Sequence, residues 1–118
     1  MTKEYLERLS ELIDQVAPSQ SSYVKLEVKH FFSGAAVYVN EKIFMTLTPV
    51  GLAIKLPEKN REKLLKERKA KNLRYFPKAP IKKDYVILQK AMSNDLKSLR
   101  YYIKMSIEHV TKEDIRKK

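Results

Sequence analysis

The sequence contains no cysteine, and no apolar run in it approaches the length of a membrane span. The absence of thiols excludes a disulfide framework, thiolate catalysis and zinc sites built from cysteine, and it fits a reducing compartment. A helix needs about 20 mostly apolar residues to cross a bilayer. The polar start of the chain, MTKEYLERLSELIDQ, is not a signal peptide. We therefore expect a cytoplasmic protein with no membrane association.

Motifs for catalysis and metal binding are also missing. Ser33 and Gly34 are not part of a G-x-S-x-G or Ser-x-x-Lys motif, so they are interpreted as a tight bend before a strand. His30 and His109 are the only histidines, they lie far apart in the sequence, and no cysteine accompanies them, so a metal site is not expected. Three carboxylates lie among lysines on a solvated helix, an environment unsuited to acid–base catalysis: Glu58, Glu62 and Glu67. We expect no enzymatic activity, no metal, no cofactor and no small-molecule substrate.

The charge of the chain is distributed unevenly. The net charge is +11, and residues 58–90 contribute +8 of it, because they contain twelve Lys/Arg and four Asp/Glu. Such a field attracts polyanions or acidic protein surfaces, although lysine-rich helices also simply keep a small domain soluble. The densest basic group consists of Lys63, Lys66, Arg68, Lys69, Lys71, Arg74, Lys82 and Lys83.

Aromatic residues are interleaved with this basic group. Exposed rings of Tyr75, Phe76 and Tyr85 would stack on bases while the lysines contact phosphates. However, Tyr75 and Phe76 are neighbours on a predicted strand, so at least one of them faces the core. No helix-turn-helix, RNP-type or C₂H₂ pattern is present, and we expect at most weak, salt-sensitive and non-specific binding of nucleic acid.

The spacing of apolar residues predicts one α+β domain over residues 1–118, with the element order α-β-β-β-α-β-β-α. The first helix lies between Thr2 and Pro18, a short second helix begins at Pro57, and the third follows a cap at Ser93 or Asn94. Residues 73–76 and 85–88 are predicted strands, which makes an antiparallel five-stranded sheet with the three strands below. Residues 24–28 alternate as a short edge strand or an extended lead-in would, and residues 110–118 are predicted to be a basic tail.

Residues 29–56 are predicted to contain three consecutive strands joined by two tight turns. Asn40-Glu41 suits a two-residue turn, because Asn tolerates positive φ. Residues 49–51 suit a three-residue turn that ends in Gly. This register pairs Val39 with Lys42, Val37 with Phe44, Thr48 with Leu52 and Thr46 with Ile54.

The predicted register divides the side chains between two apolar faces. The face expected to lie under the helices contains Ala35, Val37, Val39, Phe44, Leu52, Ile54 and Leu56. The opposite face contains Ala36, Tyr38, Ile43, Met45, Leu47, Ala53 and Lys55. Either a partner protein or a second copy of the chain covers this second face, or the N-terminal helix or C-terminal tail does. In the first case the contact residues are Tyr38, Ile43, Met45 and Leu47.

The same stretch carries a family resemblance. Residues 29–44, KHFFSGAAVYVNEKIF, followed by GLAIKL at 51–56, resemble the TfoX N-terminal domain family, whose pattern runs R-R-M-F-G-G-x-G-l-Y-v-d-G-k-x-F and then g-l-Y-L-K-v. The motif positions in this chain are Lys29, His30, Phe31, Phe32, Ser33, Gly34, Tyr38 and Phe44. The chain departs from the pattern at Phe31, Ser33, Ala36, Glu41 and Ala53, where the family has Met, Gly, Gly, Gly and Tyr.

The resemblance implies a two-layer α/β fold similar to that of secretion chaperones, and kinship with transcription regulators of bacterial competence for DNA uptake. None of the motif positions forms a catalytic site common to the family. The expected function is therefore that of a non-enzymatic regulatory or protein-interaction module, with a protein partner or a homodimer. The alternative is a non-specific nucleic-acid-binding protein that uses the basic segment 58–90.

Overall fold

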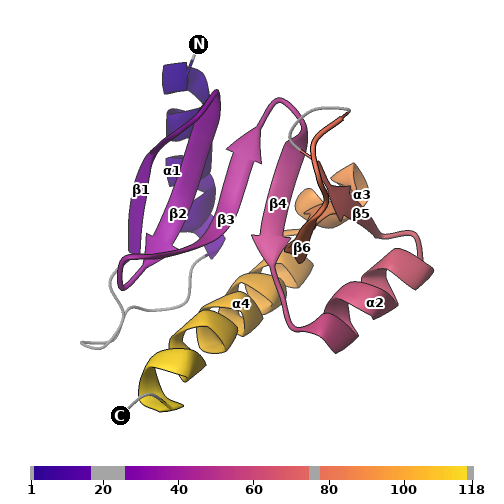
Figure 1. Ribbon diagram of the computed structural model, residues 1–118. Coiled ribbons are helices and arrows are strands. Elements are labelled where there is room, and N and C mark those ends of the chain that lie inside the picture. Colours follow the sequence, from indigo (N-terminus) through magenta and orange to yellow (C-terminus); the bar gives the residue numbers. More distant parts are fainter. Residues whose placement is uncertain (1, 17–25, 75–77, 117–118) are drawn as a thin grey trace.

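The computed structural model describes residues 2–16, 26–74 and 78–116, which form helices packed on one sheet (Figure 1). The elements are α1 (Thr2–Val16), β1 (Leu26–Phe31), β2 (Gly34–Val39), β3 (Lys42–Thr48), β4 (Gly51–Lys55), α2 (Glu58–Lys66), β5 (Ala70–Leu73), β6 (Lys82–Leu88), α3 (Lys90–Ser93) and α4 (Leu96–Arg116). The described strands form an antiparallel six-stranded sheet in the order β1-β2-β3-β4-β6-β5. The α+β class is confirmed, but the prediction of five strands is wrong.

The additional strand is β1, an edge strand that contains residues 26–28 of the predicted segment 24–28; residues 24 and 25 lie outside the described residues. It pairs with β2 along six residues, from Leu26 opposite Val39 to Phe31 opposite Gly34. Gly34 is required by close packing, because a Cβ atom there would lie 2.1 Å from the carbonyl oxygen of Leu47. β1 continues beyond residue 28 to Phe31, although Lys29 and His30 are both exposed and interrupt the alternation, and a two-residue turn then reverses the chain.

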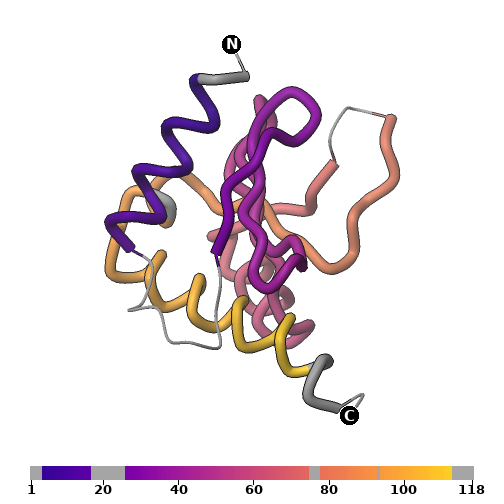
Figure 2. The backbone as a smooth tube through the Cα atoms, turned by 90° about the vertical axis from the view of Figure 1, so that its left-hand side faces the viewer, coloured from indigo at the N-terminus to yellow at the C-terminus, as the bar shows by residue number. Residues whose placement is uncertain are grey.

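α1 and α4 pack on the same face of the sheet, and the chain that leads into β6 lies on the other side (Figure 2). Their apolar residues meet the inward side chains of the strands in the main core. α2 adds Leu64 to this core beside β5 and β6. The helices contribute Leu9, Ile13, Val16, Leu64, Leu99, Ile103, Ile107 and Val110. We call the covered side the helix face and the other side the open face.

The β2–β3 hairpin contains a bulge, which the sequence did not reveal. Val39 pairs with Lys42 as predicted, but Val37 pairs with Met45 instead of Phe44. Phe44 is the additional residue of the bulge, and a bulge places two consecutive residues opposite one residue of the neighbouring strand. Phe44 and Met45 are both fully buried in the main core. Met45 therefore lies on the helix face, and its assignment to the interaction face is wrong.

The β3–β4 turn has two residues, 49–50, because Thr48 pairs with Gly51. The predicted three-residue turn is wrong, and so are the pairs Thr48–Leu52 and Thr46–Ile54. A shift of one residue moves a side chain to the other face of a strand pair. Leu47 consequently pairs with Leu52 and packs against the main core, so Leu47 also belongs to the helix face.

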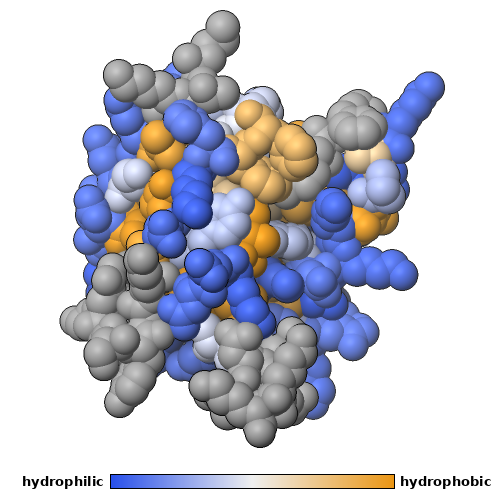
Figure 3. Space-filling model, turned by 60° about the vertical axis from the view of Figure 1, so that its left-hand side comes forward, coloured by the Kyte–Doolittle hydropathy of each residue, from blue (hydrophilic) through white to orange (hydrophobic). Residues whose placement is uncertain are grey.

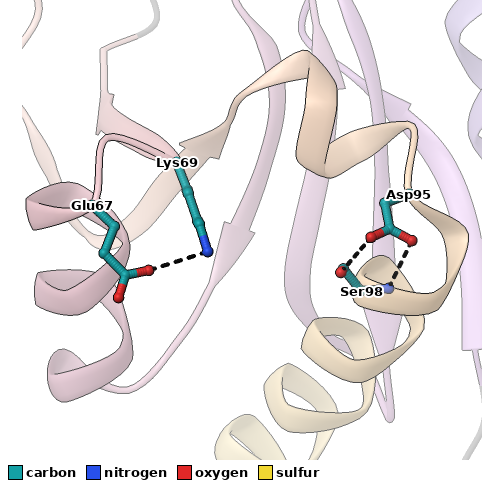
Figure 4. A network of polar contacts seen from close by, with 4 residues as sticks. All are labelled: Glu67, Lys69, Asp95 and Ser98. Atoms are coloured by element: carbon teal, nitrogen blue, oxygen red, sulfur yellow. Dashed lines mark hydrogen bonds and ion pairs between the residues drawn. The ribbon is translucent and has the colours of Figure 1, made fainter.

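The remaining elements follow the predicted order with shifted limits, except that an additional short helix, α3, lies between β6 and α4. β5 ends at Leu73, where the predicted strand began, and Tyr75 and Phe76 lie outside the described residues. α4 continues to Arg116 and so extends into the predicted tail. Asp95, not Ser93 or Asn94, caps α4, because its carboxylate accepts hydrogen bonds from the backbone N–H (3.4 Å) and hydroxyl (2.7 Å) of Ser98 (Figure 4). Within the described part of the chain, no helix is long and apolar enough to cross a membrane.

Candidate protein-interaction site

Small residues occupy the centre of the open face. Ala36, Thr46 and Ala53 lie side by side on β2, β3 and β4, and all three are fully buried. Residues with larger side chains lie on either side of these three short ones. On β6 and β5, Ile87 and Leu73 pack with Ala53 in a small second cluster.

A groove of about 560 Å³ opens on this face. One wall comes from the end of the β1–β2 hairpin, and the other comes from the segment before β6 and from the start of that strand. Its volume is in the range of sites that bind a small molecule or a small group of side chains from another protein. In Figure 3, hydrophobic residues reach the surface between hydrophilic ones on a side of the molecule where β1 and β2 come forward. The groove is lined by Phe31, Phe32, Ile43, Ala79, Pro80, Lys82 and Tyr85.

Phe32 is the most unusual residue of the groove. Its side chain is 81% exposed, and its backbone has φ of +50°. Positive φ is uncommon outside glycine and is an outlier for a bulky residue, because the side chain crowds the backbone. Strained backbone of this kind is concentrated at binding sites. The β1–β2 turn thus presents an aromatic ring to solvent at a cost in backbone energy.

The opposite wall is held by contacts with β5. Arg74 donates a hydrogen bond from Nη1 to the carbonyl oxygen of Ala79 (3.3 Å), and Ala79 is buried. Leu73 pairs with Lys82 after a register shift, which brings the start of β6 beside the end of β5. Arg74, predicted as a phosphate contact, therefore has a structural role in this wall.

Two of the four predicted interaction residues belong to the open face. Tyr38 and Ile43 pair with each other across β2 and β3, and both are half-buried. The ammonium group of Lys29 lies 5.3 Å from the centre of the Tyr38 ring, within the range of a cation–π contact. Sequence reasoning did not assign Phe31 or Phe32 to the interaction site, although both were identified as motif positions. The groove also contains Ala79, Pro80, Lys82 and Tyr85. Lys82 and Tyr85 were assigned to the basic segment and its interleaved aromatic residues, not to the interaction site.

Thr46 has a buried polar group on this face. Its hydroxyl is fully buried and has no hydrogen-bond partner among the described residues. A buried hydroxyl without a partner costs about 1–3 kcal/mol of stability. The centre of the open face is therefore not optimised for stability.

The predicted nucleic-acid residues are all exposed, but they are spread over several elements. Lys63 and Lys66 lie on α2, and the others lie on the α2–β5 turn, on or next to β5, and at the start of β6. Lys69 forms an ion pair with Glu67 (3.3 Å; Figure 4). Tyr85 is half-buried in the groove. The exposed basic residues are Lys63, Lys66, Arg68, Lys69, Lys71, Arg74, Lys82 and Lys83.

The described groups whose pKa is shifted lie away from the groove. No group of three or more His, Cys, Asp or Glu residues could hold a metal ion in the described ranges. Hydrogen bonds from the Ser98 hydroxyl and backbone lower the pKa of Asp95, and burial raises the pKa of Tyr102. Asp95 precedes α4 and Tyr102 lies on it, in the layer opposite the groove. His30 is exposed on β1 and His109 is half-buried on α4.

The family model described as the TfoX N-terminal domain matches residues 20–110. This range includes all the strands of the described sheet and both walls of the groove, and it excludes α1. No curated protein and no solved structure has a significant match to the chain. Because the matched range covers well over half of the sequence, the chain belongs to the TfoX N-terminal domain family.

Proposed function

We propose that this domain is a non-enzymatic regulatory module that binds a partner protein through the open face of its sheet. The observation that supports this most strongly is the apolar groove beside Phe32, whose ring is exposed on a strained turn. Aromatic anchors at the centre of an interface often contribute about 2–4 kcal/mol each to binding. The strain at Phe32 is reasonable if the ring is needed for such a contact.

The position of the helices supports the same function. α1 and α4 both pack on the helix face, so neither provides the cover that we considered for the open face. The centre of this face is buried, and the exposed apolar side chain that lines the groove is that of Phe32. Apolar surface exposed on small proteins commonly marks interaction sites. The kinship with competence regulators that the family resemblance implies also fits a role exerted through protein contacts.

Comparison of copurified proteins tests this function. Tagged wild type, Phe32→Asn and Tyr101→Ala are expressed at equal levels, and the bound proteins are quantified by mass spectrometry. Tyr101 is the matched control, because it is another exposed aromatic residue (60%), located on α4. We expect at least one protein to be retained by wild type and Tyr101→Ala and lost from Phe32→Asn. Equal recovery of every protein by all three forms would contradict the proposal.

Weak binding of nucleic acid is a second candidate, favoured by the exposure of all eight basic residues. Gel-shift titration with short DNA at 50 mM salt compares wild type with a variant that has Lys66, Arg68, Lys69 and Lys71 changed to Glu. If the segment binds phosphates, the variant loses binding, and wild-type affinity falls with salt with a log–log slope near −0.9 per phosphate contacted. No shift of wild type at this salt concentration would eliminate this candidate.

A further inference from the structure

We infer that the partner presents to the groove a short segment in which a large apolar side chain lies next to a carboxylate. This inference rests on the proposed function and adds the chemistry of the bound segment. Two features of the described lining support it: nearly all of its residues are apolar, and one charged residue, Lys82, lies among them.

The residues that line the groove indicate that the bound segment has a large apolar side chain. Three aromatic rings, from Phe31, Phe32 and Tyr85, and the aliphatic side chain of Ile43 surround the groove. Ala79 and Pro80 complete it without adding a side-chain hydrogen-bond donor. A volume of about 560 Å³ accepts one or two large side chains, and their burial is the favourable term in such a site.

The carboxylate is inferred from Lys82, the one charged residue among the described residues that line the groove. The Lys82 side chain is exposed, and the pairing of Lys82 with Leu73 holds its backbone in the sheet. An ion pair is stronger where apolar neighbours exclude water. A carboxylate next to an apolar anchor would therefore pair with Lys82 more strongly than a carboxylate without apolar neighbours.

The other charges on this side of the sheet do not cancel the field of Lys82. Glu27 lies 3.9 Å from the ammonium group of Lys29, so this acid is already paired. Asp84 is exposed on β6, next to Lys83. The chain as a whole has a net charge of +11. This excess favours an acidic partner and disfavours a second copy of the chain, which would bring two basic surfaces together.

Selection from a display library of random 12-residue peptides identifies the segment. Immobilised wild-type protein is the target, and immobilised Phe32→Asn is the counter-target. We expect the enriched peptides to contain Phe, Leu, Ile or Trp within two positions of Asp or Glu. Enrichment of apolar peptides with no acidic bias would contradict the inference and leave the proposed function intact. Failure to enrich any peptide on wild type over Phe32→Asn would contradict both.

A double-mutant cycle then assigns the carboxylate to Lys82. The affinity of one selected peptide, and of its amide version with Asp or Glu changed to Asn or Gln, is measured by fluorescence polarisation. We expect the amide peptide to bind wild type about 5-fold more weakly, and Lys82→Glu, whose own carboxylate repels the acid peptide, to bind the acid peptide no better than the amide peptide. Lys104→Glu is the matched control, because Lys104 is exposed on α4, and it should retain the preference for the acid.

Two results would overturn the assignment. Equal affinity of wild type for the acid and amide peptides means that Lys82 does not bind a carboxylate. A wild-type dimer in sedimentation velocity that Ile43→Lys dissociates means that a second copy occupies the groove.

Discussion

The rings of Phe31 and Phe32 lie edge to face, with centroids 4.5 Å apart and planes at 68°. Phe31 is the last residue of β1 and has regular strand pairing with Gly34, whereas Phe32 is in the turn and has positive φ. The two neighbouring aromatic residues therefore differ in their effects on folding. Phe31 is part of the hairpin, and Phe32 contributes an exposed ring to the wall of the groove.

We expect Phe32→Asn to be neutral or stabilising by up to about 1 kcal/mol. Asn tolerates positive φ much better than Phe, and the substitution removes little buried area from an exposed side chain. Binding to the partner should be lost at the same time. Thermal unfolding followed by circular dichroism measures the stability.

Phe32→Val is the control for the backbone effect. It also removes the ring, but a β-branched residue is worse than Phe at positive φ, so this variant should be less stable than wild type. If Asn and Val had the same effect on the melting temperature, backbone strain at Phe32 would not be the cause.

The bulge in β3 predicts that substitutions of neighbouring residues have opposite effects on the stability of the fold. Phe44→Ala should cost about 3–5 kcal/mol, because Phe44 is fully buried in the main core. Met45→Glu should unfold the domain, since it places a charge in the same core. Ile43→Lys should fold, because Ile43 is half-buried at the edge of the groove. Urea denaturation of the three variants checks this order, and a stable Met45→Glu would contradict the register.

The sequence predicted the order of most elements but not which residues share a face. Helical spacing identified α1 and α4, because their apolar residues repeat over many turns. The faces of β3 depend on a one-residue bulge and on a turn of two rather than three residues. Neither has a local signal at Phe44 or Pro49, since tertiary packing decides between the registers.

The groove could be predicted only in part, for a similar reason. One wall comes from Phe31 and Phe32, at the end of the first strand and in the turn that follows it. The other wall comes from residues 79–82, which lie much later in the chain. β6 lies between β4 and β5 in the sheet, and this position brings the two walls to one face. The local periodicity of a sequence does not reveal the order of the strands in a sheet. Phe32 is exposed because it lies in the turn at residues 32–33. The sequence predicts only a tight bend at Ser33 and Gly34 in this region.

Two buried hydroxyl groups should respond differently to removal. The Ser106 hydroxyl donates to the carbonyl oxygen of Lys55 (2.5 Å), so Ser106→Ala should destabilise the domain by about 1 kcal/mol. Thr46→Val should be neutral or stabilising by about 1 kcal/mol, because the Thr46 hydroxyl has no partner among the described residues. The free energy of unfolding in urea measures both, and a loss of stability in Thr46→Val would indicate a hydrogen bond to bound water.

Acid should weaken the start of α4. Bonds from the hydroxyl and then the backbone of Ser98 lower the pKa of Asp95 below its ordinary value of 3.8. The unfolded chain therefore binds this proton at a higher pH than the folded chain, so the stabilisation is complete above about pH 3.8 and is lost as the pH falls through the folded pKa.

Comparison with Asp95→Asn isolates this effect, because the amide oxygen still caps the helix and does not titrate. The free energy of unfolding of wild type should decline relative to Asp95→Asn below pH 3.8. Parallel pH profiles of the two proteins would show that the carboxylate is not stabilised by Ser98. Ser98→Ala should move the carboxyl pKa back toward 3.8.

Photo-crosslinking from position 32 tests most directly whether the groove binds a protein. Benzoylphenylalanine replaces Phe32 in one form and Tyr101 in the other, and both forms are irradiated in living cells. Both side chains are exposed, so the two probes have similar access to solvent and to partners. We predict a discrete covalent adduct with one protein from position 32, and no such adduct from position 101. Equal labelling from the two positions, or no adduct from position 32, would contradict the proposal that the open face of this domain is its binding site.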